Sequence, residues 1–328
     1  MRPADRILTL LYDRPHAPWS VDELAAAAPL GRGAVTAALE ALRRAGHRLE
    51  SFPSQGVRLL RPARPAAVLI ERDLPVRRVG RSVVCFDEVD STNAVALGAM
   101  RQADADGLAV LAESQRRGRG RHGRRWVSPP GRNVLLSVLL VEPAAGGGVR
   151  HDALTIATGV AVAEAIAESA GLSCGLKWPN DVLLEGAKVA GVLVETRRDR
   201  EAVGMVLGVG INANASPPAD AVDRSAACLA DALGAPVERV ELVRSLLVRL
   251  DGWVERLSSG AGAGGLHEAF VSRCRMLNTR ARIACDGREY VGRVLDVDPL
   301  AGLVLACDDG ATVRLPAARS TVRSGGAA

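Results

Sequence analysis

Aromatic residues are scarce in this sequence of 328 residues: phenylalanine, tryptophan and tyrosine together make up only 3% of it. A core of this chain must therefore be built mainly from alanine, valine and leucine. Hydrophobic residues of all kinds reach 48%, which is enough for at least one large core. The length exceeds what a single domain usually needs and suits two or three domains.

Long apolar runs and paired cysteines are also missing. No run of about 18 apolar residues occurs, so we expect no membrane-spanning helix. The N-terminus carries Asp5 and Asp13 and lacks a long apolar stretch, so we do not expect it to be a signal peptide. The cysteines are Cys85, Cys174, Cys228, Cys274, Cys285 and Cys307. None lies in a CxxC pair, which argues against a zinc site and a disulfide framework and favours a reducing, cytoplasmic location.

Lysine is almost absent, although the formal net charge is +5. Lys177 and Lys188 are the two lysines among 42 basic residues, and the other 40 are arginine. Such a skew indicates a GC-rich genome, in which arginine replaces lysine wherever either serves. A lysine that persists is a candidate for a position that needs a compact ammonium group rather than a planar guanidinium. Both lysines lie within one motif, although chance could also place them there.

The first 60 or so residues have the pattern of a small helical unit. Apolar residues recur at helical spacing in 6–14, and Ser20 with Glu23 forms a capping box before a second helix. A third amphipathic helix is expected over about 32–45, followed by a two-strand wing that turns at 53–56. This order predicts a helix-turn-helix unit whose third helix is the recognition helix. A three-helix interaction module that does not touch DNA is the alternative.

A Pro/Arg-rich linker, RPARPAA at 61–67, leads into a large α/β region. The expected strands are 134–141, 188–195 and 205–212. Their apolar residues do not alternate with polar ones, so we expect these strands to be buried in the middle of a sheet.

Helices are expected over 152–171 and 242–257, each with apolar residues at helical spacing. The glycine-rich stretch 260–265 is expected to be flexible. From Thr279 onward, short strands alternate with turns rich in aspartate and glycine. This spacing predicts a small β-barrel.

The most informative stretch is SQRRGRGRHGRRW at 114–126, in which three glycines alternate with six arginines. Glycine lets backbone N–H groups approach an anion closely, and arginine adds forked donors. Such a loop suits a ligand with phosphate or carboxylate oxygens. An RGG-like nucleic-acid tail and a plain solvated charge run are the alternatives.

A second motif is KWPND at 177–181, followed by GAKVAGVLVE at 186–195. Pro179 and the Asn-Asp pair predict a tight turn between strands, from which Lys177, Asn180 and Asp181 would project. Lys188 begins the next strand, so both ammonium groups are expected at one end of a sheet. A surface hairpin with stray charges is the alternative.

Two shorter motifs offer polar groups. DSTNAVA at 90–96 resembles a helix start capped by Ser91 or Thr92, whose hydroxyls could also bind a polar heterocycle. Ordinary capping explains it equally well. GVGIN at 208–212 ends a buried strand at Asn212, a candidate contact for a nucleotide or a metal-bound water.

These stretches occur together, in order and at the spacing typical of biotin–protein ligases, and the chain resembles that family over nearly its whole length. The helix-turn-helix and the barrel resemble the bifunctional branch, in which the ligase also represses biotin genes. The resemblance implies an α/β (α+β) fold: a winged helix-turn-helix in 1–62, a central mixed-sheet catalytic domain in 63–276 and an SH3-like β-barrel in 277–328. It also implies that ATP and Mg²⁺ convert biotin to biotinyl-5′-AMP, and that biotin passes to a lysine of a carboxylase carrier domain.

The resemblance assigns residues by position. The implied biotin-binding set is Ser91, Thr92, Asn93, Gln115, Gly118, Arg119, Gly120, Arg121 and Lys188. The implied nucleotide-binding set is Arg124, Trp126, Lys177, Asn180, Asn212 and Arg323. The implied catalytic set is Lys188, Arg119, Arg121 and Asp181, with no direct protein site for a metal and Mg²⁺ entering with ATP near Asp181. The implied contacts to operator DNA are Arg32, Thr36, Arg43 and Arg44, made by a homodimer.

The chain departs from the family at two points. In the last barrel strand Arg319 stands where the family often has an acid, which puts the barrel contacts in doubt. After GVGIN the family often has a TSL stretch, and this chain has Ala227, Cys228 and Leu229. Two rival functions remain: a lipoate-type protein ligase, which shares the chemistry, and a repressor that senses biotin without catalysis.

Overall fold

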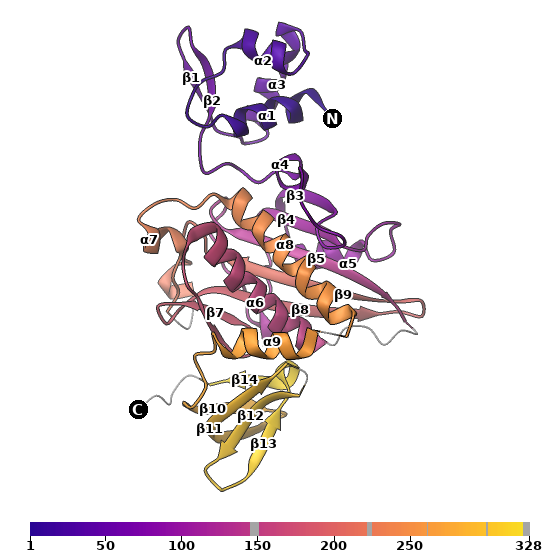
Figure 1. Cartoon of the computed structure of the whole chain (residues 1–328), viewed down its shortest axis with the longest axis vertical. Helices are drawn as coiled ribbons and strands as arrows, with labels where there is room; N and C mark the ends of the chain where they lie inside the picture. Colours follow the sequence, from indigo (N-terminus) through magenta and orange to yellow (C-terminus); the bar gives the residue numbers. More distant parts are fainter. Residues whose placement is uncertain (145–150, 222–224, 261, 300, 324–328) are drawn as a thin grey trace.

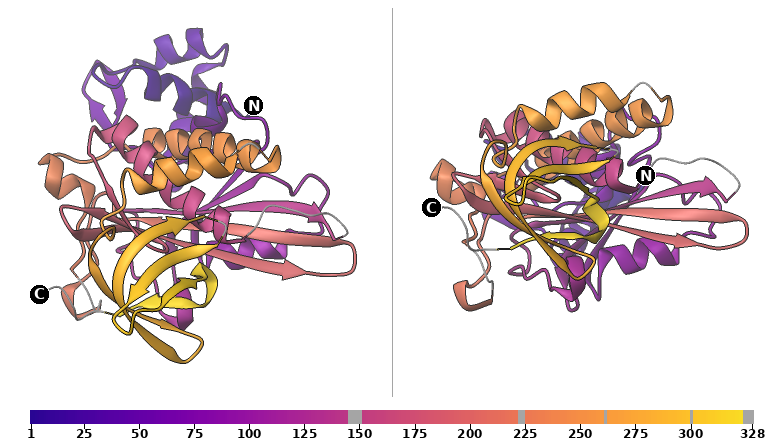
Figure 2. Two further views of the ribbon diagram at one scale, coloured as in Figure 1. Left: turned by 60° about the horizontal axis from the view of Figure 1, so that its bottom comes forward. Right: turned by 90° about the horizontal axis from the view of Figure 1, so that it is seen from below.

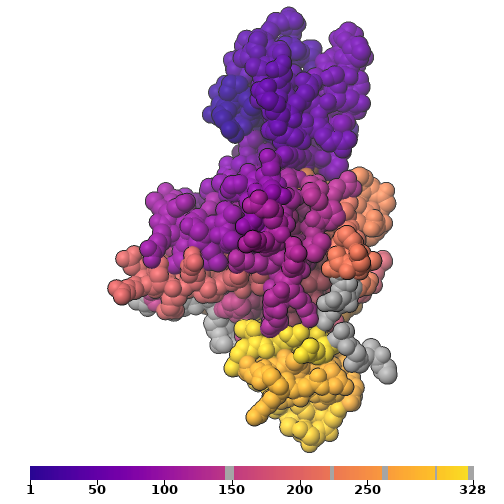
Figure 3. Space-filling model, turned by 180° about the vertical axis from the view of Figure 1, so that it is seen from behind, coloured from indigo at the N-terminus to yellow at the C-terminus, as the bar shows by residue number. Residues whose placement is uncertain are grey.

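The computed structural model describes residues 1–144, 151–221, 225–260, 262–299 and 301–323. Three groups of elements follow one another along the long axis of the molecule (Figure 1). A helical group lies at one end, a large sheet with its helices lies in the middle, and a small sheet lies at the other end. The same three parts are visible from behind in the space-filling view (Figure 3).

The N-terminal unit, defined here as α1 to β2, has the expected elements. Its bounds are α1 Pro3–Asp13, α2 Val21–Ala27, α3 Arg32–Arg44, β1 Leu49–Phe52 and β2 Gly56–Leu59. The capping box is confirmed, because Ser20 accepts from the Glu23 N–H and the Glu23 side chain accepts from the Ser20 N–H. Helix α3 buries Val35, Leu39 and Leu42, and β1 and β2 form an antiparallel hairpin.

The central sheet has seven strands in the order β3-β4-β5-β9-β8-β7-β6. Their bounds are β3 Ser82–Val89, β4 Leu108–Gln115, β5 Val134–Pro143, β6 Gly175–Lys177, β7 Asp181–Leu184, β8 Ala187–Arg198 and β9 Ala202–Ile211. The sheet is mixed, because β3 and β4 run parallel whereas the other neighbours are antiparallel. The expected central strands are thus confirmed.

Helices cover both faces of this sheet, which explains why its strands lack polar alternation. Helices α6 (His151–Ala170) and α8 (Arg239–Ser258) pack together on one face. Helix α5 (Thr92–Gly98) lies on the other face, as Figure 2 shows. Along β5, Leu136 and Val138 belong to the larger core cluster, whereas Leu139 packs in the cluster around α5.

Helix α6 is long and apolar enough, by length and composition, to cross a membrane. In this fold 72% of its most apolar window is buried. It contacts α8 and strand β8, so it serves as a core helix of the central part.

One expectation is wrong: the stretch 260–265 is not wholly flexible. Helix α9 runs over Gly262–Val271 and so includes residues 262–265, whereas residue 261 lies outside the described residues. The helix is held by Leu266 and Phe270, which are 0% and 2% exposed. These apolar anchors lie after the glycine-rich stretch and outweigh its weak helix propensity.

The C-terminal unit, β10 to β14, is a five-stranded antiparallel sheet in the order β13-β12-β11-β10-β14. Its bounds are β10 Arg280–Cys285, β11 Arg288–Asp298, β12 Gly302–Cys307, β13 Thr312–Leu315 and β14 Ser320–Val322. Ile283, Val294 and Leu305 are fully buried in it. The last strand begins at Ser320 rather than earlier, because 317–319 form a 3-10 turn.

Candidate functional site

A cavity opens on the α5 face of the central sheet. It is bounded by the start of α5, the glycine- and arginine-rich loop, the β6–β7 turn, strands β8 and β9, and strand β14 of the C-terminal unit. The residues singled out from the sequence that line it are Ser91, Thr92, Asn93, Gln115, Arg119, Gly120, Arg121, Arg124, Trp126, Asn180, Asp181 and Lys188. Segments spread over most of the chain therefore meet at one place.

Four other residues of those sets lie elsewhere. Gly118 lines a groove between the loop and strand β8, and Asn212 lines a second cavity next to the first. Lys177 and Arg323 are not among the described residues that line any of these hollows. Lys177 lies directly opposite Asp181 in the β6–β7 ladder.

Glycines form the floor of the cavity. A Cβ on Gly210 would lie 2.3 Å from the Trp126 ring, and a Cβ on Gly208 would lie 2.3 Å from Asn93 Oδ1. A Cβ on Gly191 would lie 3.0 Å from both Lys188 and Trp126. The backbone of β8 and β9 is bare so that these side chains can lie directly on it. Sequence reasoning missed this role, although the alternating glycines of GVGIN were its signal.

At one end of the cavity the polar side chains are uncharged and buried. The Thr92 N–H donates to Gln115 Oε1 at 2.8 Å. Ser137 Oγ lies 2.7 Å from Thr92 Oγ1 and 2.6 Å from Asn93 Oδ1. Ser91 is the N-cap residue of α5, but neither it nor Thr92 caps the helix with its side chain, which corrects the capping interpretation. Ser137 was missed because it looks like one polar residue in an apolar strand.

The arginine-rich loop is folded back on itself. The Gly120 N–H donates to Arg124 O at 2.7 Å, and the Trp126 N–H donates to Gly118 O at 3.1 Å. A Cβ on Gly118 would lie 2.4 Å from Trp126 O, so this position requires glycine. Arg119 forms an ion pair with Glu195 at 3.0 Å. Glu195, at the end of LVE, is a second residue that sequence reasoning missed.

Arg121 crosses from the loop to the C-terminal unit. Its guanidinium donates to Ser320 O at 3.1 Å and to Ala317 O, and it lies 3.5 Å from Asn180 Oδ1. Burial lowers the pKa of Arg121 from its usual value. Ala318 N–H donates in turn to Asp152 at the start of α6, at 3.1 Å. Arg121 and Asp152 therefore both help to hold the C-terminal unit against the site.

At the charged end of the cavity, Lys188 Nζ lies 2.5 Å from Asp181 Oδ1. The ammonium group also lies 5.6 Å from the centre of the Trp126 ring, within reach of a cation–π contact. Lys188 and Asp181 line both the first and the second cavity. They therefore stand where the two cavities meet.

The second cavity contains an unsatisfied polar group. Asn212 is 2% exposed, and its Nδ2 donates to Ala227 O at 3.1 Å. Its Oδ1 is buried without a hydrogen-bond partner. A buried amide oxygen left in this state is costly, so it indicates a ligand that donates a hydrogen bond there.

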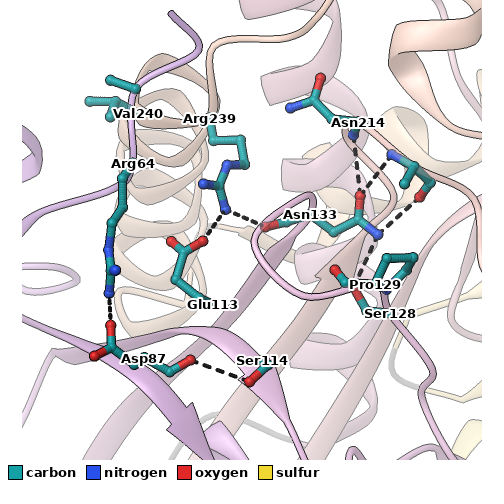
Figure 4. A network of polar contacts seen from close by, with 12 residues as sticks. Arg64, Asp87, Glu113, Ser114, Ser128, Pro129, Asn133, Asn214, Arg239 and Val240 are labelled. Carbon is teal, nitrogen blue, oxygen red and sulfur yellow. Dashed lines mark hydrogen bonds and ion pairs between the residues drawn. The ribbon is translucent and has the colours of Figure 1, made fainter. Parts of the chain in front are cut away.

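A polar network anchors the segments behind both cavities (Figure 4). Arg239, at the start of α8, donates to Glu113 on β4 at 3.0 Å and to Asn133 O at 3.2 Å. The Asn133 side chain accepts from the Asn214 N–H at 3.2 Å and donates to Ser128 at 3.0 Å. The chain that follows Trp126 and the chain that follows Asn212 are thus held together.

The candidate DNA contacts lie far from this cavity, on the outer face of α3. Arg32, Thr36, Arg43 and Arg44 are all exposed, because the buried face of the helix is the one with Val35, Leu39 and Leu42. Arg32 pairs with Asp22, and Arg43 donates to Ser51 of the wing at 3.0 Å. The exposed face of α3 is therefore polar and rich in arginine.

A resident metal does not fit the described part of the chain. Within residues 1–144, 151–221, 225–260, 262–299 and 301–323, no group of three or more His, Cys, Asp or Glu side chains could hold a metal ion. Asp181 is the one carboxylate lining the first cavity among these residues, and it is paired with Lys188. A divalent cation would therefore have to bring most of its ligands with it, as one bound to ATP does.

The chain is similar to known proteins over most of its length. The sequence model of the Biotin/lipoate A/B protein ligase family matches residues 85–212. The "Bifunctional ligase/repressor BirA" of Bacillus subtilis is 28% identical, covering 85% of this chain and 86% of that protein. The "Biotin--[acetyl-CoA-carboxylase] ligase" of Mycobacterium tuberculosis is 32% identical, covering 72% of this chain and 90% of that protein.

A solved structure agrees with these relatives. The biotin protein ligase from Aquifex aeolicus in complex with biotin and ATP has a TM-score of 0.64 and 25% identity. The match covers 74% of this chain and 98% of that one. The cavity contains the motifs by which the chain resembles such enzymes, and the relatives match over most of their length. This chain therefore belongs to the biotin–protein ligase family.

Proposed function

We propose that the protein activates biotin with ATP to give biotinyl-5′-AMP and transfers biotin to a lysine of a biotin carboxyl carrier domain. One observation carries this proposal: a single cavity joins an uncharged polar end to a charged end. Thr92, Asn93 and Gln115 form the uncharged end, which suits the ureido ring of biotin. Lys188 and the loop arginines form the other, which suits a carboxylate and phosphates.

In the first step, a carboxylate oxygen of biotin attacks the α-phosphorus of ATP. The new bond joins that oxygen to the phosphorus, the bond from the α-phosphorus to the bridging oxygen breaks, and diphosphate leaves. Two anions must approach each other, so the site must offset their repulsion. Lys188 stands where the two cavities meet and is assigned to this role. Arg119, on the wall of the first cavity, adds a second cation.

Asp181 positions Lys188 rather than reacting itself. Its carboxylate lies 2.5 Å from the ammonium group, which holds that group over the floor of β8. Mg²⁺ supplies further charge neutralisation when it arrives bound to ATP. Asn212 and Arg124, which line the second cavity, are assigned to the nucleotide, and the unsatisfied Asn212 Oδ1 would accept from it.

In the second step, the lysine amine of the carrier attacks the acyl carbon of biotinyl-AMP. An amide bond forms, the acyl–phosphate bond breaks, AMP leaves with the bonding electrons, and the amine loses a proton. Biotinyl-AMP is a mixed anhydride that water would destroy. The folded loop and strand β14, which also bound the cavity, would shield it.

A direct test is to incubate the protein with α-labelled ATP and one acid at a time, biotin or lipoate. We expect labelled acyl-AMP to form with biotin. Biotin should then pass to a carrier domain, and the label should leave with AMP. If acyl-AMP forms faster from lipoate than from biotin, the protein is instead a lipoate-type ligase. Biotin binding without any adenylate would leave only a biotin-sensing repressor.

A second function, binding of operator DNA, is favoured by the exposed arginine-rich face of α3 and by the hairpin that follows it. Residues 1–62 would then be a winged helix-turn-helix domain, with 63–276 the catalytic domain and 277–328 an SH3-like barrel. A homodimer would read two half-sites. The relatives named as bifunctional repressors support this reading, and a cytoplasmic location would suit both functions. Gel-shift assays with DNA upstream of biotin genes, with and without biotin and ATP, test it.

A further inference from the structure

A chain of hydrogen-bonding side chains leads from a charged pair at the arginine-rich loop into the uncharged end of the cavity. In order, it consists of Arg119, Glu195, Asn93, Ser137, Thr92 and Gln115. It begins on the arginine-rich loop and passes beneath the expected position of the ligand. The direction of its hydrogen bonds follows from which atoms can only donate or only accept.

At each end of this hydrogen-bonded series of side chains, one group can only accept or only donate a hydrogen bond, and this fixes the orientation of its partner. The Glu195 carboxylate, paired with Arg119 at 3.0 Å, only accepts, so the atom of Asn93 that lies 2.7 Å from it is the amide nitrogen. At the other end, the backbone N–H of Thr92 only donates, so the atom of Gln115 that lies 2.8 Å from it is Oε1. Neither amide is free to turn over.

In the middle of this series, the number of hydroxyl protons fixes the direction of each hydrogen bond. Ser137 is 0% exposed, and its hydroxyl lies 2.6 Å from Asn93 Oδ1 and 2.7 Å from Thr92 Oγ1. Its one proton must go to Asn93 Oδ1, because that atom has none to offer. The Thr92 hydroxyl must then donate to Ser137, because otherwise the two hydroxyl oxygens would face each other at 2.7 Å with no proton between them. Gln115 Oε1, 3.1 Å from the Thr92 hydroxyl, keeps the bond from the Thr92 N–H.

We propose that Glu195 is a specificity-determining positioning residue. Acting through Asn93 and Ser137, it holds the Thr92 hydroxyl so that only a lone pair faces the cavity. The cavity then requires an N–H donor at that point, and Gln115 Nε2 remains to donate to a carbonyl oxygen. A cyclic urea has both groups, whereas a dithiolane ring has neither. This inference rests on the proposed function and adds which residue sets its selectivity.

The probes are biotin and its two cyclic carbamate analogues, in each of which one ring N–H is replaced by oxygen. Their dissociation constants for the full-length protein are measured by calorimetry without ATP. In the wild type, the analogue that places oxygen against Thr92 meets two facing lone pairs and binds poorly. Glu195→Gln removes the shorter of the two bonds that fix the Asn93 amide and leaves the longer one to Leu193 O at 3.4 Å, so the amide can turn over. The Thr92 hydroxyl can then turn and donate to that oxygen.

We expect Glu195→Gln to reduce the preference for biotin over that one analogue by about tenfold, the value of one hydrogen bond with a matched partner. Ser137→Ala, which interrupts the chain but leaves the Arg119–Glu195 pair in place, should reduce the same preference. The other analogue is an internal reference, and its ratio to biotin should not change. Glu201→Gln, in the exposed hairpin between β8 and β9, is the matched control.

A simple loss of packing would weaken all three ligands together and leave the ratios unchanged, which would overturn the inference. Equal effects on both analogues would overturn it too, because the chain leads to one hydroxyl. If the wild type does not bind biotin at all, the proposed function fails as well. If the wild type binds biotin and the ratios stay constant in both variants, only the role of Glu195 fails.

Discussion

At the scale of single residues, Lys188 occupies a space with little room to spare. Its Nζ touches Asp181, and a Cβ at Gly191 would already lie 3.0 Å from it. The planar head of arginine is wider than an ammonium group and prefers to bind two oxygens in one plane. In a chain where 40 of 42 basic residues are arginine, we infer that lysine persists at this point because the site needs a compact ammonium group.

We therefore predict that Lys188→Ala reduces the rate of biotinyl-AMP formation by about 100-fold or more, the usual loss when one charge-stabilising group is removed. Lys188→Arg should restore only part of it. Single-turnover measurement of labelled biotinyl-AMP checks both. Arg197→Lys, exposed on the same strand, is the control for such an exchange. A fully active Lys188→Arg would contradict the assigned role.

His47 gives a prediction about pH. It lies between α3 and β1 of the N-terminal unit and is 7% exposed, and burial, with a smaller effect of Arg64, lowers its pKa to about 4. The His47 side chain binds a proton near pH 6.5 in the unfolded protein but only near pH 4 in the folded protein. Its contribution to the free energy of unfolding is therefore fully present above pH 6.5 and is lost as the pH falls towards 4. The loss amounts to about 3 kcal/mol.

Hydrogen exchange of α1 to α3, corrected for its intrinsic dependence on pH, should therefore accelerate as pH falls from 6.5 to 4.5. His47→Leu should remove most of this acceleration, because leucine does not titrate. His16→Gln, at an exposed position, should leave it intact. An acid response that survives in His47→Leu would assign it to other groups.

At the scale of elements, strand β9 is important because two of its positions have no side chain. Gly208 and Gly210 alternate along it and leave bare backbone under Asn93 and Trp126. We predict that Gly210→Ala forces the Trp126 ring away from Lys188 and lowers biotinyl-AMP formation at least tenfold. The strain should cost about 1–3 kcal/mol of stability.

Thermal unfolding and the adenylation assay measure the two effects separately. Gly252→Ala is the matched control, since the nearest atom to its new Cβ is Arg256 Nη2, 3.8 Å away. In helix α8 it should be neutral or stabilise by about 0.5–1 kcal/mol. Wild-type adenylation by Gly210→Ala would show that the ring position is not critical.

Most elements could be predicted from the sequence because their signals are local. The capping box before α2 and the turn between β6 and β7 each depend on a few adjacent residues. Helix α9 was missed because its stability comes from Leu266 and Phe270 packing against distant elements.

The candidate site was predictable where the chemistry needs an unusual residue type, as at the arginine-rich loop and Lys188. Ser137 and Glu195 are common residues on apolar strands, and only the pairing of β5 with β9 and of β9 with β8 brings them to the cavity. Register is a long-range property, so no local pattern revealed them.

At the scale of the whole molecule, the N-terminal unit is docked on the central part through α8. Tyr12 donates to Glu241 at 2.7 Å, and Arg61 pairs with Glu238 at 2.7 Å. Glu238 adjoins Arg239, which begins the network of Figure 4. Helix α8 therefore contacts both the candidate DNA-binding unit and the segments behind the cavities.

We predict that deletion of residues 1–62 abolishes operator binding, because Arg32, Arg43 and Arg44 are removed. Adenylation should persist, since every residue lining the first cavity lies at or beyond Ser91. Loss of the contacts with Glu238 and Glu241 should lower the melting temperature. Gel shifts and the adenylation assay report the two functions, and a truncated protein that still shifted operator DNA would refute the assignment.

The shortage of lysine has a consequence for side reactions. Biotinyl-AMP that escapes labels nearby amines, and this chain offers Lys177, Lys188 and its N-terminus. We predict little self-biotinylation, even in Arg121→Gly, which loses the contact with the C-terminal unit and should release the intermediate. Incubation with a lysine-rich bystander and mass spectrometry should find most adducts on the bystander. Strong labelling of Lys188 would contradict its proposed engagement.

The contact between Arg121 and the chain at strand β14 can form only late in the synthesis of the protein. Ribosomes build the chain from its N-terminus, and Thr321 and Val322, which line the cavity, are made after every other part of it. A nascent chain can fold its central sheet and loop while Arg121 still lacks the carbonyl groups of Ala317 and Ser320. The wall that strand β14 adds to the cavity is therefore the last part of the site to be synthesised.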